Sequence, residues 1–170
     1  QLTYFNNDIQ YGSKYILKRS LDIFISISAL IFLSPIFLLI SLYIYKLDKG
    51  APILTQIRIG LHGRKFKMYK FRTMKKNSHQ LRDKLREQSK NDPEIFKLHD
   101  DPRILDGAKF LRKYSLDELP QFINVLNGTM SIVGPRPLFE EDTLLFNKSY
   151  MRRLNVLPGI TGLLQIKERN

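Results

Sequence analysis

The hydrophobic pattern of the chain is dominated by one long apolar stretch near its N-terminus. Residues 23–45 carry no charged side chain, and Ser34-Pro35 interrupts the stretch at its middle. Cationic residues stand on both sides of it, namely Lys14, Lys18, Arg19, Lys46 and Lys49. The stretch is long enough to enter a membrane, and because both flanks are cationic, neither resembles the translocated side of a membrane protein.

Three structures fit this stretch. As one helix, at about 1.5 Å per residue, it would reach roughly 35 Å and could span a hydrocarbon core of about 30 Å. Bent at Pro35, each arm would reach only about 18 Å, as in a re-entrant hairpin, and the Ser34 hydroxyl could bond a carbonyl freed by the break. A buried core helix is the third alternative. The pattern by itself leaves all three open.

Beyond this stretch, the pattern predicts a β-hairpin and several helices. Residues 52–59 and 65–73 are rich in β-branched and aromatic residues, and Gly60-Leu61-His62-Gly63 separates them, which predicts a hairpin with a bulge near Met68-Tyr69. Helical spacing and capping signals predict helices over residues 77–91, 107–113, 116–126 and 138–155.

Composition narrows the chemistry. The chain has 28 Lys and Arg against 16 Asp and Glu, and this net charge of +12 favours anionic partners such as phosphates, nucleic acid or acidic lipid headgroups. It has no cysteine, which excludes disulfides and thiol chemistry, and its histidines share no metal-ligand spacing. A length of 170 residues suits a single domain over residues 1–170.

Two adjacent acids, Asp117 and Glu118, are the first candidates for chemistry. Ser115 and Glu118 have the Ser-x-x-Glu spacing of a capping box, which would explain Glu118 as a residue that caps a helix. Alternatively, the helix N-terminus would keep a carboxylate ionised and help to bind a phosphate. One acid would then serve as a nucleophile and the other as a metal ligand.

Gly134-Pro135-Arg136-Pro137 is the second candidate. Two prolines fix the backbone around Arg136, so its guanidinium would extend from a stiff turn that suits a phosphate. An ordinary exposed turn between two helices explains the same residues. Arg112 could point at the same site, and Lys70 and Arg72 are further cations on or beside the predicted hairpin.

An ordered set of short motifs carries a family resemblance. The motifs are Lys18-Arg19-x-x-Asp22, Ser34-Pro35, Lys70-Phe71-Arg72-Thr73-Met74, Asp101-Pro102-Arg103, Leu111-Arg112, the segment 115–121, Asn124-Val125-Leu126, Met130-Ser131, the segment 133–137 and the segment 158–162. Together they resemble the bacterial sugar transferases, the monotopic polyprenyl-phosphate phosphoglycosyl transferases that begin lipid-linked glycan assembly. The resemblance covers nearly the whole chain from Lys18 onward.

The resemblance implies a fold and a reaction. The expected fold is α+β and mainly helical, with a re-entrant membrane helix-break-helix over about residues 18–46 and a cytosolic catalytic part over about residues 47–170. The latter would hold a short β-hairpin and amphipathic helices at the membrane interface. Asp117 would attack the sugar-linked phosphate of a UDP-sugar, expel UMP and form a phospho-sugar aspartyl intermediate, from which polyprenyl phosphate takes the phospho-sugar.

The resemblance also implies roles and partners. Asp117 and Glu118 would be catalytic, with Glu118 holding Mg²⁺. Substrate phosphate would be bound by Arg136, Arg112 and Arg72. The chain would enter the membrane at Lys18, Arg19 and Asp22, with Asp22 paired to one of these cations, and would turn back at Ser34-Pro35. The implied partners are a UDP-sugar, undecaprenyl phosphate and the lipids of the bacterial inner membrane at its cytoplasmic face, with no nucleic acid.

Two positions depart from the family pattern. Thr129 stands where an acid usually precedes Met-Ser, and Glu168 replaces a glycine before Arg169-Asn170. Family members normally continue past this point, so the sequence leaves open whether the chain is a fragment of a larger enzyme, as well as the sugar, the glycan pathway and any homo-oligomer. The alternative function is a non-enzymatic, membrane-anchored basic domain that binds anionic lipid or nucleic acid.

Overall fold

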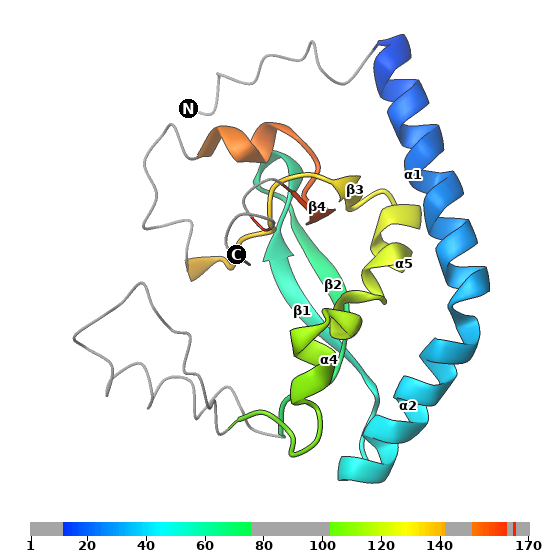
Figure 1. The fold of residues 1–170 in the computed structure, drawn as a ribbon. Coiled ribbons are helices and arrows are strands. Elements are labelled where there is room, and N and C mark those ends of the chain that lie inside the picture. The colour runs from blue at the N-terminus through cyan, green and yellow to red at the C-terminus, as the bar shows by residue number, and fades with distance from the viewer. Residues whose placement is uncertain (1–11, 76–102, 142–150, 163–164, 166–170) are drawn as a thin grey trace.

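The computed structural model describes residues 12–75, 103–141, 151–162 and 165. The helix expected over residues 77–91 and the middle of the one expected over residues 138–155 lie outside these ranges. A bent pair of helices, α1 (Ser13–Phe32) and α2 (Ser34–Asp48), forms one side of the molecule. Short helices lie between this pair and most of a β-hairpin, so the described part is a mixture of helix and strand (Figure 1).

The apolar stretch breaks where the sequence predicts. The axes of α1 and α2 differ by 61°, and Pro35 occupies the first turn of α2, where a missing N–H is tolerated. Ser34 Oγ donates a hydrogen bond of 2.8 Å to the carbonyl of Ile31, which confirms the expected serine contact. Within the described residues, neither helix alone is long and apolar enough to span a membrane, but the bent pair meets that test by length and composition.

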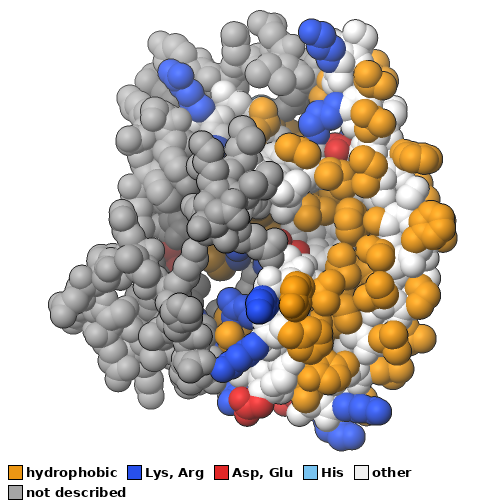
Figure 2. Space-filling view, in the orientation of Figure 1, with side chains coloured by type: hydrophobic (Ala, Val, Ile, Leu, Met, Phe, Trp, Pro, Cys, Tyr) orange, Lys and Arg blue, Asp and Glu red, His pale blue; other side chains and the backbone are white. Residues whose placement is uncertain are grey.

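Most apolar side chains of the helix pair face outward. In α1 the only buried residues are Asp22 and Ser26, and in α2 they are Ile40 and Ile44. On the face that Figure 2 shows, exposed apolar side chains form a nearly continuous surface over both helices. This exposure excludes the buried core helix. It also makes α1 differ from a helix of a soluble core, because both of its buried residues are polar and most of its apolar residues are exposed.

The inward-facing polar groups of α1 attach it to the rest of the molecule. Asp22 forms an ion pair of 3.0 Å with Lys18, which confirms the expected pairing. Its carboxylate also accepts hydrogen bonds from the Ser131 hydroxyl at 2.8 Å and the Ile132 amide at 3.1 Å, both in strand β3 (Ser131–Val133). Arg19 donates to carbonyls at the C-terminal end of helix α5 (Gln121–Leu126).

The hairpin is confirmed, without the bulge. Strand β1 (Ile53–Ile59) pairs antiparallel with β2 (Lys65–Phe71) in unbroken register, and the 3-10 turn η2 (Leu61–Gly63) joins them. The expectation of a bulge near Met68-Tyr69 is wrong. The alternation of polar and apolar residues slips there because β2 is covered on both faces: Met68 is buried, and Tyr69 and Lys70 are partly buried.

The segment after the hairpin is more broken than its pattern predicts. Helix α4 (Lys109–Lys113) confirms the helix expected near residues 107–113. The single helix expected over residues 116–126 is wrong, because it divides into the 3-10 turn η3 (Leu116–Glu118) and α5. Pro120, which lacks an N–H to continue the first turn, stands directly before α5.

The last expected helix is also wrong at its start. Leu138 forms an antiparallel bridge with Ile59 instead of beginning a helix over residues 138–155. The end of that range is the 3-10 turn η5 (Arg152–Asn155), and strand β4 (Gly159–Thr161) follows and pairs in parallel with β3. These pairings bring the segment after β3 between the hairpin and the C-terminal part of the chain.

Two of the three apolar clusters in the described residues fix the hairpin to its neighbours. In the first, Ile40 and Ile44 of α2 pack against Phe71 at the end of β2 and Leu111 of α4. In the second, Met68 of β2 packs against Val125 of α5 and against Met130. The hairpin is therefore fixed both to the helix pair and to the segment that carries the two acids.

Candidate active site

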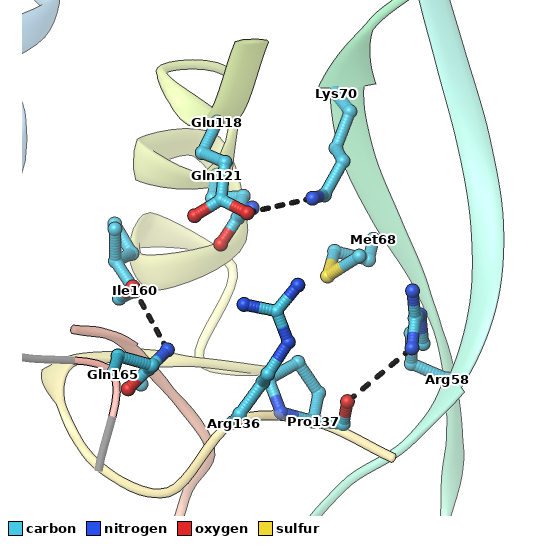
Figure 3. Close-up of a pocket in the computed structure, with 10 residues that line it drawn as sticks. Arg58, Met68, Lys70, Glu118, Gln121, Arg136, Pro137, Ile160 and Gln165 are labelled. Carbon is cyan, nitrogen blue, oxygen red and sulfur yellow. Dashed lines mark hydrogen bonds and ion pairs between the residues drawn. The ribbon is translucent and has the colours of Figure 1, made fainter. Parts of the chain in front are cut away.

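A pocket lies where β2, η3, α5 and the turn after β3 meet (Figure 3). Its lining residues are Arg58, Met68, Lys70, Glu118, Gln121, Arg136, Pro137, Gly159, Ile160 and Gln165. The structure thus brings Glu118 and Arg136, two residues singled out from the sequence, to one cavity. Figure 3 shows the Arg136 guanidinium extending toward Glu118 and Gln121.

Glu118 is held in the pocket by an ion pair from another element. Lys70 Nζ of β2 lies 2.7 Å from Glu118 Oε1, and the two side chains are only 14% and 19% exposed. The capping-box interpretation is wrong, since Ser115 adopts a left-handed conformation (φ 53°) and its side chain makes no capping hydrogen bond. Glu118 therefore points at the hairpin rather than back along its own turn. Limited solvent around the pair keeps its electrostatic attraction strong.

Asp117 is buried beside this ion pair, with 9% of its surface exposed, and it does not line the pocket. Burial raises the pKa of Asp117 above its usual value, the charge of Lys70 opposes this, the neighbouring Glu118 reinforces it, and Arg112 opposes it. A helix terminus would lower the pKa of a carboxyl group, so the net shift of Asp117 is opposite in direction to the one expected from such a terminus alone. The turn η3 has only three residues, and desolvation outweighs its partial charges.

The turn that carries Arg136 follows β3 directly. A side chain could not replace Gly134, because a Cβ there would lie 2.4 Å from the carbonyl oxygen of Leu157. Arg136 itself is exposed and reaches the pocket from this close contact between backbones. The alternative of an ordinary turn between two helices is wrong on one side, since a strand and not a helix precedes it.

The other two arginines lie outside the lining. Arg112 is exposed on α4 and acts on the pocket region only through its charge near Asp117. Arg72 is buried and forms an ion pair of 2.9 Å with Asp48 at the end of α2. Its position joins the hairpin to the helix pair, and the phosphate-binding role expected for Arg72 stays a prediction.

Three lining residues gain importance from the structure. Lys70 is the ion-pair partner of Glu118, although the sequence marks it only as an additional cation. Gln121, with 3% of its surface exposed, lies on the turn after Glu118. Arg58 stacks on the ring of Phe139, with its guanidinium carbon 3.2 Å from the ring centre. No local spacing signal connects Lys70 or Arg58 to the acids, because these cations reach them only through the packing of the hairpin, whereas Gln121 lies three residues after Glu118 in the same motif.

The pocket fits a metal that is shared with substrate. Within the described residues, no three His, Asp or Glu side chains gather into a protein-only metal site. Mg²⁺, however, is commonly held by one or two carboxylates together with substrate phosphates and water. Glu118, which faces the pocket next to Lys70 and Arg136, provides such a carboxylate.

A carboxylate and several cations around one pocket are the groups that a protein handling a phosphorylated ligand needs. The chain belongs to the bacterial sugar transferase family, whose model matches residues 13–170. It is thus a member of a family of transferase enzymes, which confirms the resemblance seen in the motifs.

Three similar proteins have names that agree with this family assignment. The chain is 44% identical over 160 residues to the exopolysaccharide production protein ExoY of Sinorhizobium fredii, covering 90% of this chain and 70% of that protein. It is 43% identical over 173 residues to the undecaprenyl-phosphate galactose phosphotransferase of Salmonella typhimurium, covering 96% and 35%. It is 42% identical over 158 residues to the UDP-glucose:undecaprenyl-phosphate glucose-1-phosphate transferase of Klebsiella pneumoniae, covering 91% and 32%. The chain therefore spans about a third of the longer relatives.

Proposed function

We propose that this protein transfers a sugar-1-phosphate from a UDP-sugar to undecaprenyl phosphate and releases UMP. The observation that carries the proposal is the convergence of Glu118, Lys70 and Arg136 on one pocket, with Asp117 buried next to them. Two relatives named for transfer of a sugar phosphate to undecaprenyl phosphate support it.

The charges around the pocket suit a pyrophosphate. Arg58, Lys70 and Arg136 line it against the single carboxylate of Glu118, which leaves an excess of positive charge. Phosphoryl transfer depends chiefly on positioning and on neutralising the charge of the transferred group. Arg136 is exposed and its side chain extends into the pocket, so it would contact phosphate oxygens most directly.

Asp117 would act as the nucleophile. One of its carboxylate oxygens attacks the sugar-linked phosphorus, the bond from that phosphorus to the oxygen of UMP breaks, and the electron pair leaves with UMP. In the second step an oxygen of undecaprenyl phosphate attacks the same phosphorus, and the Asp117 carboxylate leaves. Covalent catalysis of this kind divides one difficult displacement into two easier ones, and a carboxylate stripped of water by burial is a better nucleophile.

Glu118 would hold Mg²⁺, which when bound would supply positive charge to the phosphates of the donor. In the structure Glu118 is engaged by Lys70. With Glu118 as a metal ligand, Lys70 would be available to bind a phosphate oxygen of the donor. Arg112 would contribute to this region through its charge.

The bent helix pair would place the pocket at the cytoplasmic face of the inner membrane. From the break outward, each uncharged arm has about 12 residues, or roughly 18 Å of helix, which is well short of a hydrocarbon core of about 30 Å. Both arms are attached to the same folded part, through Asp22 and Arg19 on one side and Ile40 and Ile44 on the other. A re-entrant arrangement keeps this polar part on one side, whereas a span would draw part of it into the bilayer.

Release of UMP tests the proposed function. The full chain in detergent micelles, given undecaprenyl phosphate, Mg²⁺ and a panel of UDP-sugars, should release UMP from at least one donor. Asp117→Asn should abolish the release, while Asp106→Asn, at a side chain that is 94% exposed, should leave it unchanged. Normal turnover by Asp117→Asn would reject the nucleophile, and no release from any donor would favour a binding module.

A further inference from the structure

The turn that carries Arg136 has too few backbone N–H groups of its own to bond its carbonyls. Pro135 and Pro137 have no backbone N–H, so donors from elsewhere must satisfy the carbonyls of the turn. Two donors come from backbone. The Gly159 amide of β4 donates to the carbonyl of Pro135 at 2.9 Å, and the Ile59 amide of β1 donates to the carbonyl of Leu138 at 2.9 Å.

Arginine side chains supply the donors for the two carbonyls in between. Arg153 of η5 donates from Nη2 to the carbonyl of Arg136 itself, at 2.8 Å. Arg58 of β1 donates from Nη1 to the carbonyl of Pro137 across a longer distance of 3.4 Å. Arg58 is 5% exposed, and Phe139 lies against its guanidinium. Four consecutive carbonyls of the turn are therefore bonded from three different elements.

We propose that Arg153 and Arg58 are positioning residues that fix the backbone of Arg136 so that its guanidinium meets the donor pyrophosphate. The inference rests on the proposed function of Arg136. Arg153 holds the very peptide unit from which the Arg136 side chain extends. With that bond in place, the backbone around Arg136 is already ordered before the ligand arrives, which lowers the entropy lost on binding.

Placing two further cations beside Arg136 has an electrostatic cost that the hydrogen bonds offset. Arg58 and Arg153 each donate to a carbonyl, and Arg58 also faces an aromatic ring, which favours a guanidinium over an ammonium. Their charge adds to the attraction for phosphate, so the experiment must separate the effect of the bond from the effect of the charge.

Arg152 offers a matched control for Arg153. It is the preceding residue of the same turn, carries the same charge and is exposed. Equilibrium dialysis of the full chain in micelles with UDP and Mg²⁺ measures binding without turnover. We expect Arg153→Met to raise the Kd for UDP about tenfold, as for loss of one hydrogen bond from a charged donor, and Arg152→Met to change it less than twofold.

A double-mutant cycle separates positioning from a general effect. In an Arg136→Ala background, Arg153→Met should cause no further loss, because the side chain that it positions is gone. Arg153→Lys should restore most of the affinity, since an ammonium can donate to the same carbonyl. Arg58→Met should behave like Arg153→Met, with a lower melting temperature because the side chain is buried.

Each remaining outcome overturns the inference in a recognisable way. Equal losses from Arg153→Met with and without Arg136 would show that Arg153 acts independently of it. Equal losses from Arg152→Met and Arg153→Met would show that charge alone matters. If Arg136→Ala binds UDP normally, the proposed role of Arg136 fails and the inference fails with it, whereas the Asp117→Asn result on UMP release would still stand.

Discussion

Asn124 connects the helix after the acids to the hairpin, and its replacement should weaken both the fold and the site. It is 1% exposed. Its side-chain oxygen accepts from the Tyr69 amide at 2.9 Å, and its side-chain nitrogen donates to the Lys67 carbonyl at 2.7 Å. β2 pairs with β1 along its other edge, so the Asn124 amide takes the place of a third strand on the free edge.

Asn124→Ala would leave the amide of Tyr69 and the carbonyl of Lys67 without this partner. Each such group in a site with little water destabilises a protein by about 1–3 kcal/mol. Both bonds are part-buried, so we expect a loss of about 2–4 kcal/mol in the free energy of unfolding. For a chain of this size, 1 kcal/mol lowers the melting temperature by about 2–4 °C, so the expected decrease is about 5–15 °C.

Loss of the Asn124 hydrogen bonds should also disturb the pocket, because Lys70 directly follows Tyr69 in β2 and pairs with Glu118. Differential scanning calorimetry in micelles measures stability, and UMP release below the lowered melting temperature measures activity. Asn127→Ala, at an exposed residue one turn away, should change the melting temperature by less than about 1–2 °C. If Asn124→Ala had the same melting temperature as the wild type, the idea that this amide holds the edge of β2 would be refuted.

Two further predictions follow from the structure. Burial raises the pKa of Asp117, so the folded state holds that proton more tightly than the unfolded state, and stability falls as pH rises through the raised pKa. The Asp117→Asn variant should therefore have a higher melting temperature than the wild type at pH 7 and the same melting temperature at low pH. Release of UMP by the wild type should rise with pH through a pKa above that of an ordinary aspartate. A lower melting temperature of the variant at pH 7 would contradict the effect of burial on Asp117. Since the chain has no native cysteine, Ser13→Cys and Lys49→Cys can be labelled singly, and both should react from the cytoplasmic side of the membrane, whereas labelling from opposite sides would establish a span.

The sequence predicted those features whose signals are local. The break at Ser34-Pro35 follows from proline geometry, and the hairpin follows from β-branched and aromatic residues around a glycine-rich loop. The family resemblance implied that Asp22 pairs with Lys18 or Arg19, and the partner in the structure is Lys18, four residues away on the same helix. Each of these depends on residues close together in the chain, so no knowledge of packing was needed.

The features that the sequence did not predict depend on tertiary contacts. The partner of Glu118 is Lys70, 48 positions away, and this contact replaces the local capping box that the spacing with Ser115 suggests. The sign of the pKa shift of Asp117 depends on burial, which its position at the start of a helical pattern does not reveal. Arg153 bonds to the carbonyl of Arg136 only because β3 and β4 pair in parallel and bring η5 beside the turn.

The proposed reaction requires a pocket held at a fixed height above the membrane, and one short strand provides this. β3 is tied to the helix pair through Asp22, which bonds to Ser131 and Ile132. The turn that carries Arg136 begins directly after β3, at Gly134. With so few residues between β3 and Arg136, a shift of α1 against the rest of the protein would also displace the Arg136 side chain. Under the proposed function, the same carboxylate therefore sets both the depth of the protein in the bilayer and the position of Arg136.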